Sequence, residues 1–438
     1  NNKNNRPKTQ EANKKIKNPP NQATHKIKIN PLNQAAQKIK IHPSNQAPQK
    51  IKIHPPNQAT QKITNPPINQ AAHKIIAQTP NKESDNFQII MLQEINKSNI
   101  GKNIMISPLS IYHILSLTAN GAENKTLREM LKALCQRNKI ELNKNNELIS
   151  SSIAKLKSVE LANAIFTKFK PLDNFMKKVK DYKATIDQLI NEAQINKWCC
   201  DATHKKIPVI IDKLTDDDLM VLINAIYFKG FWKEKFDKKL TDKDQFMNCN
   251  KEPKEVDFMH ITKKFDYFED KELQAISLNY QKDHLKALII LPNPTIDINT
   301  YIKDFTIEKY TKILKKLVNI KVIFSLPKFE IQFKAELKNI FTSLGMIEPF
   351  SDNADFSVMR KEKDIKIAKI IHKTFIKIDE RGTEAAAVTA VVMMKSLACA
   401  NKKPDPIMNV DRPFLFIIRS NDLPSGQDML FVSKVEFL

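Results

Sequence analysis

The stretch Ile378–Ala390 reads IDERGTEAAAVTA and contains two conflicting signals. Small residues recur at every second position, and a period of two is typical of a strand with one buried face. Alanine is a poor strand former, however, and the same composition also allows an alanine-rich helix. If the segment is a strand, its inward face is small enough to fit between strands that are already packed. These inward positions are Thr383, Ala385, Ala387 and Thr389.

Residues 1–82 differ in composition from the rest of the 438-residue chain. Residues 21–80 are five copies of a twelve-residue unit, and every copy contains proline and lacks an acidic residue. Such repeats offer too little apolar surface to offset the entropy of ordering them. We therefore expect a disordered tail over residues 1–82 and one folded domain over residues 83–438. The copies begin at Asn21, Asn33, Asn45, Asn57 and Asn69.

The tail also carries most of the net charge. Residues 1–80 hold 14 lysines and arginines against Glu11 alone, a net charge of +13 out of +23 for the whole chain. Such an arm is expected to bind polyanions or an acidic matrix, weakly and with strong salt dependence. Two alternatives remain, namely a solvated spacer without a partner and a substrate for transglutaminase at pairs such as Gln37-Lys38.

Features that bear on the compartment are few. Five cysteines without a CxxC pair are too few for a disulfide framework. No apolar run is long enough to span a membrane. The triplets Asn96-Lys97-Ser98 and Asn124-Lys125-Thr126 are possible glycosylation sites. On these grounds we expect a secreted, extracellular protein.

The folded part contains short apolar runs that are each interrupted by one asparagine. Leu161–Phe166 contains Asn163, and Val221–Phe228 contains Asn224. A buried amide is costly unless it is hydrogen-bonded, so each asparagine implies a polar partner in the core. Further along, Thr126-Leu127-Arg128-Glu129 has the spacing of a capping box and predicts the start of a helix.

Motifs for catalysis are absent from the sequence. The six glycines form no GxSxG, GxGxxG or phosphate loop, and the nine histidines show no HExxH spacing. Neither the histidines nor the cysteines have the spacing of a zinc site. We therefore expect a protein that is not an enzyme and that needs no cofactor or metal.

The stretch Glu380–Ala390 resembles the reactive-loop hinge of the serpins, and the resemblance extends in order from Ser84 to Leu438. It is carried by Asn224–Trp232 (NAIYFKGFW), Ala287–Pro292, Leu326–Phe329, Arg412–Ile418 and Leu430–Val435. The resemblance implies an α+β fold with a large central mixed β-sheet, flanking helices, a second β-sheet or barrel and an exposed reactive loop. It also implies a hinge made of Glu380, Gly382, Thr383, Ala385, Ala386, Ala387 and Thr389.

The activity implied by the resemblance is suicide inhibition. A serine or cysteine protease attacks the loop and forms an acyl-enzyme, and it is trapped when the freed strand enters the main sheet. Family spacing places the reactive bond at Ser396–Leu397, which suits an elastase-like or cysteine protease. A shift of one residue gives Lys395–Ser396, which suits a trypsin-like protease and is the preferred prediction. The loop between Glu380 and Pro413 is longer than is usual in the family, so Cys399, Lys402 and Lys403 also stay open as points of attack. The alternative is a non-inhibitory serpin that serves as a binding, storage or matrix-tethered structural protein through its basic repeat tail. In either case we expect a monomer.

A set of polar residues is also implied by the resemblance. They are predicted to gather beneath the central sheet, in the region called the shutter, and to control how easily its middle strands part. The set is Ser107, Ser110, Asn163, Asn224 and His372, and Trp232 is expected at the breach, where the top of the sheet opens.

Overall fold

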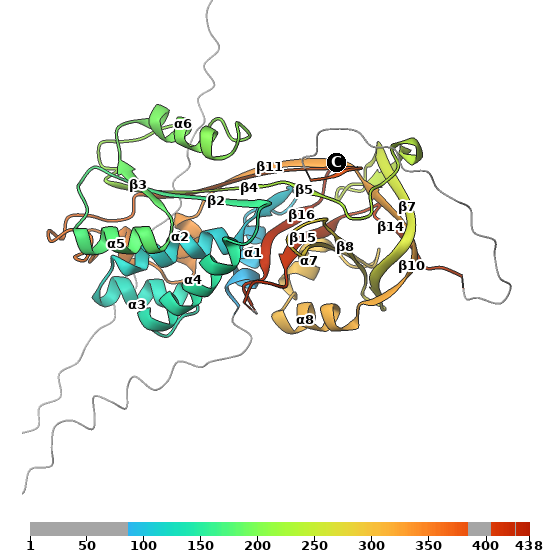
Figure 1. Cartoon of the computed structure of the whole chain (residues 1–438), viewed down its shortest axis with the longest axis horizontal. Coiled ribbons are helices and arrows are strands. Elements are labelled where there is room, and N and C mark those ends of the chain that lie inside the picture. The colour runs from blue at the N-terminus through green and yellow to red at the C-terminus, as the bar shows by residue number, and fades with distance from the viewer. Residues whose placement is uncertain (1–85, 384–403, 425) are drawn as a thin grey trace, which may run out of the picture. The chain divides into compact units, whose positions relative to one another are not determined.

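The computed structural model describes residues 86–383, 404–424 and 426–438. The predictions for the tail 1–82 and its repeats, and those for Ala385–Leu397, lie outside these residues. Within them, two β-sheets and a set of helices share one large core. This is the α+β architecture that the sequence predicts (Figure 1).

The main sheet contains the central strands of the molecule. Within the described residues its order is β3-β2-β4-β12-β13-β5, and β11 pairs with β12. Strands β4 and β12 run parallel, and so do β2 and β3, whereas β2 is antiparallel to β4 and β11 is antiparallel to β12. The bounds are β2 Val159–Thr167, β3 Thr185–Gln188, β4 Met220–Phe228, β5 Gly230–Phe231, β11 Phe329–Glu336, β12 Lys369–Asp379 and β13 Gly382–Thr383.

The second sheet has the order β1-β16-β15-β9-β8-β7-β10-β14, and β6 pairs with the start of β7. Its middle strands β9, β15 and β16 are buried on both faces, as near-continuous apolar runs require. The bounds are β1 Ile104–Ile106, β6 Asp242–Met247, β7 Pro253–Glu269, β8 Leu273–Asn279, β9 Leu285–Pro292, β10 Val318–Pro327, β14 Ile407–Asn409, β15 Phe414–Ser420 and β16 Met429–Val435.

Helices cover both faces of the main sheet, with α6 on one side and α2, α4 and α5 on the other (Figure 1). Helix α2 is buried along its whole length, and Ser107 caps its first turn just before Pro108. The bounds are α1 Phe87–Lys97, α2 Pro108–Asn120, α3 Asn124–Ala133, α4 Lys139–Ile153, α5 Asp173–Asp181, α6 Glu192–Ala202, α7 Ile298–Lys303, α8 Ile307–Lys316 and α9 Lys338–Ser343, with short 3₁₀ turns at Lys238–Leu240 and Glu348–Phe350.

The predicted capping box is wrong. Helix α3 begins at Asn124, so Thr126 lies within its first turn. The Thr126 hydroxyl accepts a hydrogen bond from the Asp355 backbone N–H at 2.8 Å. The Glu129 carboxylate instead accepts from the backbone N–H groups of Ile347 and Glu348, at 2.7 and 2.6 Å. Both side chains therefore join α3 to a distant segment. The backbone N–H groups of that segment take the place of the N–H groups at the start of the helix that a capping box would use.

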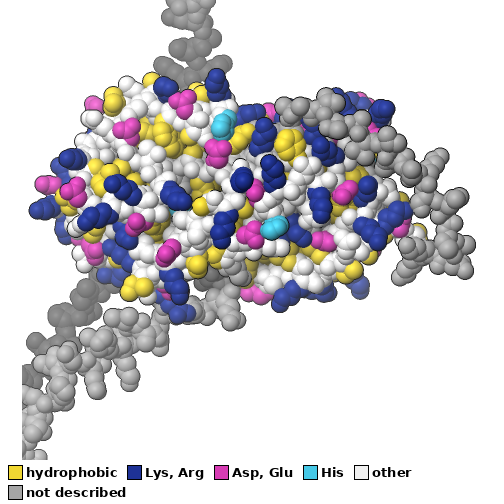
Figure 2. Space-filling view, viewed as in Figure 1, with side chains coloured by type: hydrophobic (Ala, Val, Ile, Leu, Met, Phe, Trp, Pro, Cys, Tyr) yellow, Lys and Arg dark blue, Asp and Glu magenta, His cyan; other side chains and the backbone are white. Residues whose placement is uncertain are grey.

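No helix of the described residues combines the length and the apolar character needed to cross a lipid bilayer. Lysine and arginine side chains are spread over the visible face and lie among acidic ones, as Figure 2 shows. Many lysines and arginines of the described residues form ion pairs, for example Lys197 with Asp201 at 2.8 Å. The face in view therefore has a mixed charge pattern.

Candidate functional site

The hinge begins with a tight reversal of the chain at the end of β12. After Glu380 and Arg381 the chain returns as β13, which pairs with β12 on one side and with β5 on the other. Gly382 is opposite Asp379 and Phe231, and Thr383 is opposite Ile378 and Gly230. Two hinge residues thus form a short strand inside the main sheet. Ala385, Ala386, Ala387 and Thr389 lie outside the described residues, so their strand conformation stays a prediction.

Glycine is required at position 382 by close packing. Its φ angle is +145°, and a Cβ atom there would lie 2.1 Å from the carbonyl oxygen of Gly230 and 2.8 Å from the Cα of Phe231. Both neighbours are backbone atoms, which cannot move aside as a flexible side chain could. Only glycine lets β13 enter between β12 and β5 in this way.

An aromatic pair holds the second hinge residue. Thr383 is buried, and its hydroxyl lies 2.9 Å from the Tyr280 hydroxyl. The Tyr280 ring stacks on Trp232 with centroids 4.5 Å apart. The Trp232 indole N–H donates to the Asp379 carbonyl at 3.0 Å. Trp232 is therefore buried at the position where β12 ends and the hinge turns, and its role at the breach stays a prediction.

Glu380 is a buried carboxylate at the same turn. Its oxygen accepts from the Thr241 hydroxyl at 3.0 Å and lies 3.3 Å from the Lys328 ammonium. Burial opposes ionisation of Glu380, but its own backbone N–H, Thr241 and Lys328 together lower the pKa of the carboxyl below its usual range. Glu380 is thus charged at neutral pH and ties the hinge to the segment between β10 and β11.

Beneath the sheet, His372 connects α2 to the two central strands. The Ser107 backbone N–H donates to His372 Nε2 at 3.2 Å, so this nitrogen carries no proton. The other ring nitrogen, Nδ1, then donates to the side-chain oxygen of Asn224. Asn224 and His372 are also register partners across the β4–β12 pair. Their contact therefore bridges the two strands through side chains.

The other predicted polar residues continue from Asn224. Its amide nitrogen contacts the Ser110 hydroxyl and the Asn163 side-chain oxygen. Ser110 also donates to Asn163 at 3.3 Å. All five residues, Ser107, Ser110, Asn163, Asn224 and His372, lie in one connected network of α2, β2, β4 and β12. A role for this network in sheet opening stays a prediction.

Two further residues extend the network and were not predicted. The Asn163 amide donates to His113 Nδ1 at 3.2 Å, which leaves the proton of the neutral ring on Nε2. That nitrogen lies 3.2 Å from the Ser150 hydroxyl on α4. His113 lies three residues after Ser110 on α2, so the two share a helix face. This spacing is the one signal that could have pointed to His113.

Acid should weaken this network. Burial lowers the pKa of His372 to about 3 and that of His113 to about 4, from an ordinary 6.5. Both imidazoles are neutral in the folded protein, whereas the unfolded chain takes up protons below about pH 6.5. Their contribution to stability is therefore complete above pH 6.5 and is lost as the pH falls toward 4, at up to about 1.4 kcal/mol per pH unit for each histidine.

We expect the thermal midpoint to fall between pH 6.5 and 4, and a His113→Gln variant to lose part of that slope when both proteins are scanned by calorimetry. A matched control is His284→Gln, because His284 is an exposed residue that pairs with Asp422 at the surface. Equal slopes for wild type and His113→Gln would contradict this account.

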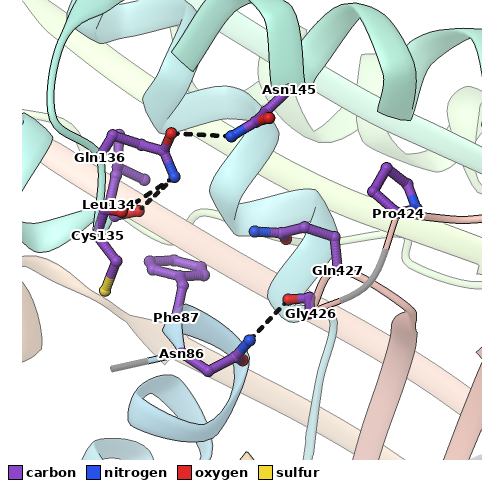
Figure 3. Close-up of a pocket in the computed structure, with 9 residues that line it drawn as sticks. All are labelled: Asn86, Phe87, Leu134, Cys135, Gln136, Asn145, Pro424, Gly426 and Gln427. Carbon is purple, nitrogen blue, oxygen red and sulfur yellow. Dashed lines mark hydrogen bonds between the residues drawn. The ribbon is translucent and has the colours of Figure 1, made fainter. Parts of the chain in front are cut away.

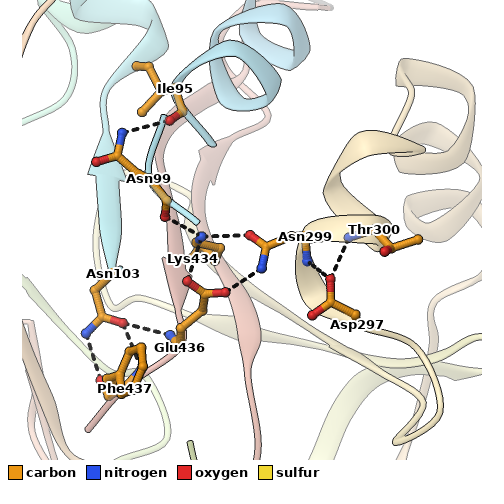
Figure 4. A network of polar contacts seen from close by, with 9 residues as sticks. All are labelled: Ile95, Asn99, Asn103, Asp297, Asn299, Thr300, Lys434, Glu436 and Phe437. Carbon is orange, nitrogen blue, oxygen red and sulfur yellow. Dashed lines mark hydrogen bonds and ion pairs between the residues drawn. The ribbon is translucent and has the colours of Figure 1, made fainter. Parts of the chain in front are cut away.

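A second polar cluster was missed by the sequence analysis (Figure 4). Lys434 and Glu436 are both fully buried, and the Lys434 ammonium lies 2.7 Å from Glu436 Oε2. Asn299 at the start of α7 completes the pair, because its oxygen accepts from Lys434 at 2.9 Å and its amide donates to Glu436 at 2.6 Å.

A small cavity of about 190 Å³ lies beside the first described residue (Figure 3). Asn86 caps α1 and donates to the Gly426 carbonyl at 2.9 Å, which fixes the start of α1 against the turn before β16.

Within residues 86–383, 404–424 and 426–438, no three histidine, cysteine or acidic side chains come close enough together to hold a metal ion.

The chain belongs to the serpin family, since the family model described as Serpin (serine protease inhibitor) matches residues 82–436. Human Serpin B8 is 33% identical over 355 residues, 76% of this chain and 93% of that protein. Intracellular coagulation inhibitor 2 of Tachypleus tridentatus is 31% identical, over 78% of this chain and 87% of that protein. These similarities support protease inhibition in general.

Solved structures agree with the fold. The native thermophilic serpin tengpin superimposes with a TM-score of 0.73 at 31% identity, covering 82% of this chain and 95% of that chain. Thyroxine-binding globulin in complex with thyroxine gives a TM-score of 0.72 at 27% identity, covering 80% of this chain and 97% of that chain. The serpin fold predicted from the motifs is therefore confirmed.

The prediction of a secreted, extracellular protein is wrong. The finding that counts against secretion is that the similar proteins include one that is named an intracellular coagulation inhibitor. The two glycosylation triplets had favoured secretion, but triplets of this kind also occur by chance. Asn96 is only 5% exposed, and the Asn124 amide donates to Asp355 at 2.9 Å. The buried Asn96 amide is therefore not accessible to a glycan in the fold, whereas Asn124 is exposed.

Proposed function

We propose that this protein inhibits a trypsin-like serine protease by suicide-substrate loop insertion, with Lys395–Ser396 as the bond that is attacked. The observation that carries the proposal is the position of β13. Gly382 and Thr383 already run antiparallel to β12 inside the main sheet, in the direction that an inserting strand would continue. The next residues would enter between β12 and β4.

Insertion requires β4 and β12 to separate. They are joined over six registered pairs, from Lys369–Val221 to Thr374–Ile226, and by the His372–Asn224 side-chain contact. An inserted strand replaces this single parallel ladder with a ladder on each side, so the number of backbone hydrogen bonds rises. The small inward residues predicted at positions 385, 387 and 389 would fit the space without displacing the core.

The chemistry of trapping follows from ordinary acyl transfer. The protease serine oxygen bonds to the Lys395 carbonyl carbon, and the Ser396 amine leaves with a proton. Insertion then carries the esterified protease along with the strand before water can complete hydrolysis. In this role the protein is a substrate that stalls its enzyme, and it is not itself an enzyme. Lysine before the cleaved bond suits a protease whose pocket contains an aspartate.

The first test is incubation of the full chain with trypsin, elastase and a papain-like protease, followed by denaturing gels and mass spectrometry. We expect a denaturant-stable complex with trypsin and a released peptide that begins at Ser396. Lys395→Ala should slow complex formation about 10²–10⁴-fold, because the acidic pocket loses its cation. Lys402→Ala is the matched control and should leave the rate unchanged.

Other outcomes of the same experiment favour other functions. A peptide that begins at Leu397, from a complex with elastase or the cysteine protease, would move the reactive bond to Ser396–Leu397. Cleavage without any complex, and without a gain in thermal stability, would contradict inhibition. It would favour a non-inhibitory serpin that serves binding, storage or matrix attachment, with the +13 charge of residues 1–80 as the contact to polyanions. One relative of similar fold is described with bound thyroxine.

A further inference from the structure

A serine, a histidine and an aspartate lie side by side on the outer face of the second sheet. Ser325 on β10 and His260 on β7 are register partners, and the Ser325 hydroxyl lies 2.8 Å from His260 Nδ1. The other ring nitrogen, Nε2, lies 2.8 Å from the Asp242 carboxylate at the start of β6. A carboxylate only accepts, so in the neutral ring Nε2 carries the proton and Nδ1 accepts from Ser325. A nucleophile, a general base and a carboxylate that orients the base have this order of contacts.

These three residues are accessible from solution. The side chains of Asp242 and His260 are 71% and 31% exposed, and Ser325 is partly exposed. His113 also contacts a serine hydroxyl, but it is buried and its other ring nitrogen bonds to an amide instead of a carboxylate. No sequence motif contains the set on the second sheet, because its members come from three different strands.

A side-chain amide stands on the other side of Ser325. Asn409 on β14 is the register partner of Ser325 in the parallel β10–β14 pair, so the two residues lie on one face about 5 Å apart. The Asn409 side-chain oxygen is buried, whereas its amide nitrogen is not, and that nitrogen has no acceptor in the part of the chain that the structure describes. It is therefore free to donate to an oxygen held above Ser325. An oxyanion donor is needed at such a position, across the nucleophile from the base.

Two exposed isoleucines continue this face by one step along the strands. Ile323 and Ile407 are register partners two residues before Ser325 and Asn409, and they are 41% and 63% exposed. Two residues of a strand span about 6.6 Å, which is the length of an acyl chain of about five carbons. An apolar acyl group that lies on these side chains places its carbonyl carbon at Ser325.

We propose that this face is an esterase site for short-chain carboxylic esters, with Ser325 as the nucleophile and His260 as the general base. Ser325 Oγ bonds to the ester carbonyl carbon, its proton passes to His260 Nδ1, and Asn409 donates to the developing oxyanion. The bond to the alcohol oxygen then breaks, and the alcohol leaves with the proton from His260. Water next gives a proton to His260 and attacks the acyl carbon, the acid leaves, and Ser325 regains its proton.

Covalent labelling of the full chain tests the nucleophile. The probe is an alkyl fluorophosphonate, whose phosphorus bonds to an activated serine oxygen with loss of fluoride, and mass spectrometry of peptides locates the label. We expect the label on Ser325 and none on Ser343, an exposed serine that donates only to the Ile340 carbonyl at 2.7 Å. His260→Gln should slow labelling about 10²–10⁴-fold. Absence of the label from Ser325 in the folded wild type would overturn the proposal.

Hydrolysis of p-nitrophenyl butyrate measures the activity. We expect the wild type to turn over more than one equivalent of ester, and Ser325→Ala to lower kcat at least about 10²-fold. Asn409→Ala should lower kcat about 10²-fold as well, because the oxyanion loses its donor. Ser343→Ala is the matched control and should hydrolyse the ester as the wild type does. Wild-type hydrolysis by Ser325→Ala would show that another group attacks the ester and would overturn the site.

Asp242 acts through His260 and is therefore a positioning residue. Asp242→Asn should lower kcat about tenfold and leave KM unchanged, which is less than for a buried carboxylate because water reaches this side chain. Asp242→Glu should recover most of the loss. An equal loss in both variants would overturn the positioning role. These assays use no protease, so their failure is distinguishable from failure of the inhibitory function.

Discussion

Replacing Thr383 by arginine is expected to convert the protein from an inhibitor into a substrate of its target protease. Thr383 is 1% exposed, and its hydroxyl meets Tyr280 inside the sheet. Because Thr383 already lies in the sheet, the arginine would displace β13, and insertion would then have to return the charge to this space without an acidic partner. Burying an unpaired charge costs several kcal/mol. Each 1.4 kcal/mol added to the insertion barrier slows it about tenfold, so deacylation overtakes trapping.

The measurement is the ratio of trapped complex to cleaved protein on a denaturing gel. Strand β13 contains only two residues, so its displacement leaves the β4–β12 ladder in place and the variant should fold. Glu384→Arg is the matched control, because alternation predicts that its side chain faces outward and it should retain inhibition. A Thr383→Arg protein that traps protease as fully as the wild type would contradict the insertion mechanism.

Glu436→Gln is expected to give the largest loss of stability. Lys434 would then be a fully buried ammonium without its counter-charge, and breaking a buried pair costs about 3–5 kcal/mol. Burial already lowers the pKa of Lys434, and Glu436 opposes that shift. In the variant the folded-state pKa should fall further. The penalty should therefore grow as the pH falls and shrink as the pH rises toward the ordinary pKa of lysine.

Urea unfolding at several pH values measures this effect. Asp201→Asn provides the comparison, because the exposed Lys197–Asp201 pair is worth about 1 kcal/mol or less. The double variant Lys434→Met with Glu436→Leu should recover most of the loss, since an apolar pair needs no charge compensation. A Glu436→Gln protein as stable as Asp201→Asn would show that water or a rearranged donor reaches the site.

Sequence reasoning predicted those features that a local pattern determines. Apolar runs that contain Asn163 and Asn224 require buried amide partners, and the structure provides them. The small residues after Gly382 predicted a strand able to enter a sheet, and Thr383 lies in one. The alternation of small residues could not predict how far the hinge enters the main sheet. That depends on the turn at Glu380 and on the close approach of Gly230 to Gly382.

The sequence could not predict contacts between distant segments of the chain. Ser150 is 37 residues from His113, and nothing in either neighbourhood identifies the other as its partner. The Lys434–Glu436 pair looks like one exposed face of a closing strand, yet it is buried because α7 covers it. Thr126 and Glu129 had the spacing of a local cap, but distant backbone donors bind both side chains.

The stacking of Trp232 on Tyr280 has a practical consequence. The chain contains two tryptophans, and the other one, Trp198, lies on α6 against Phe166. In a Trp198→Phe variant, all indole emission would come from Trp232. That ring stacks on Tyr280, which contacts Thr383, and its N–H donates to the Asp379 carbonyl. Movement of the hinge into or out of the sheet would then alter the fluorescence directly. The protein carries a built-in optical reporter, and stopped-flow recording could follow its conformational change in real time without a dye.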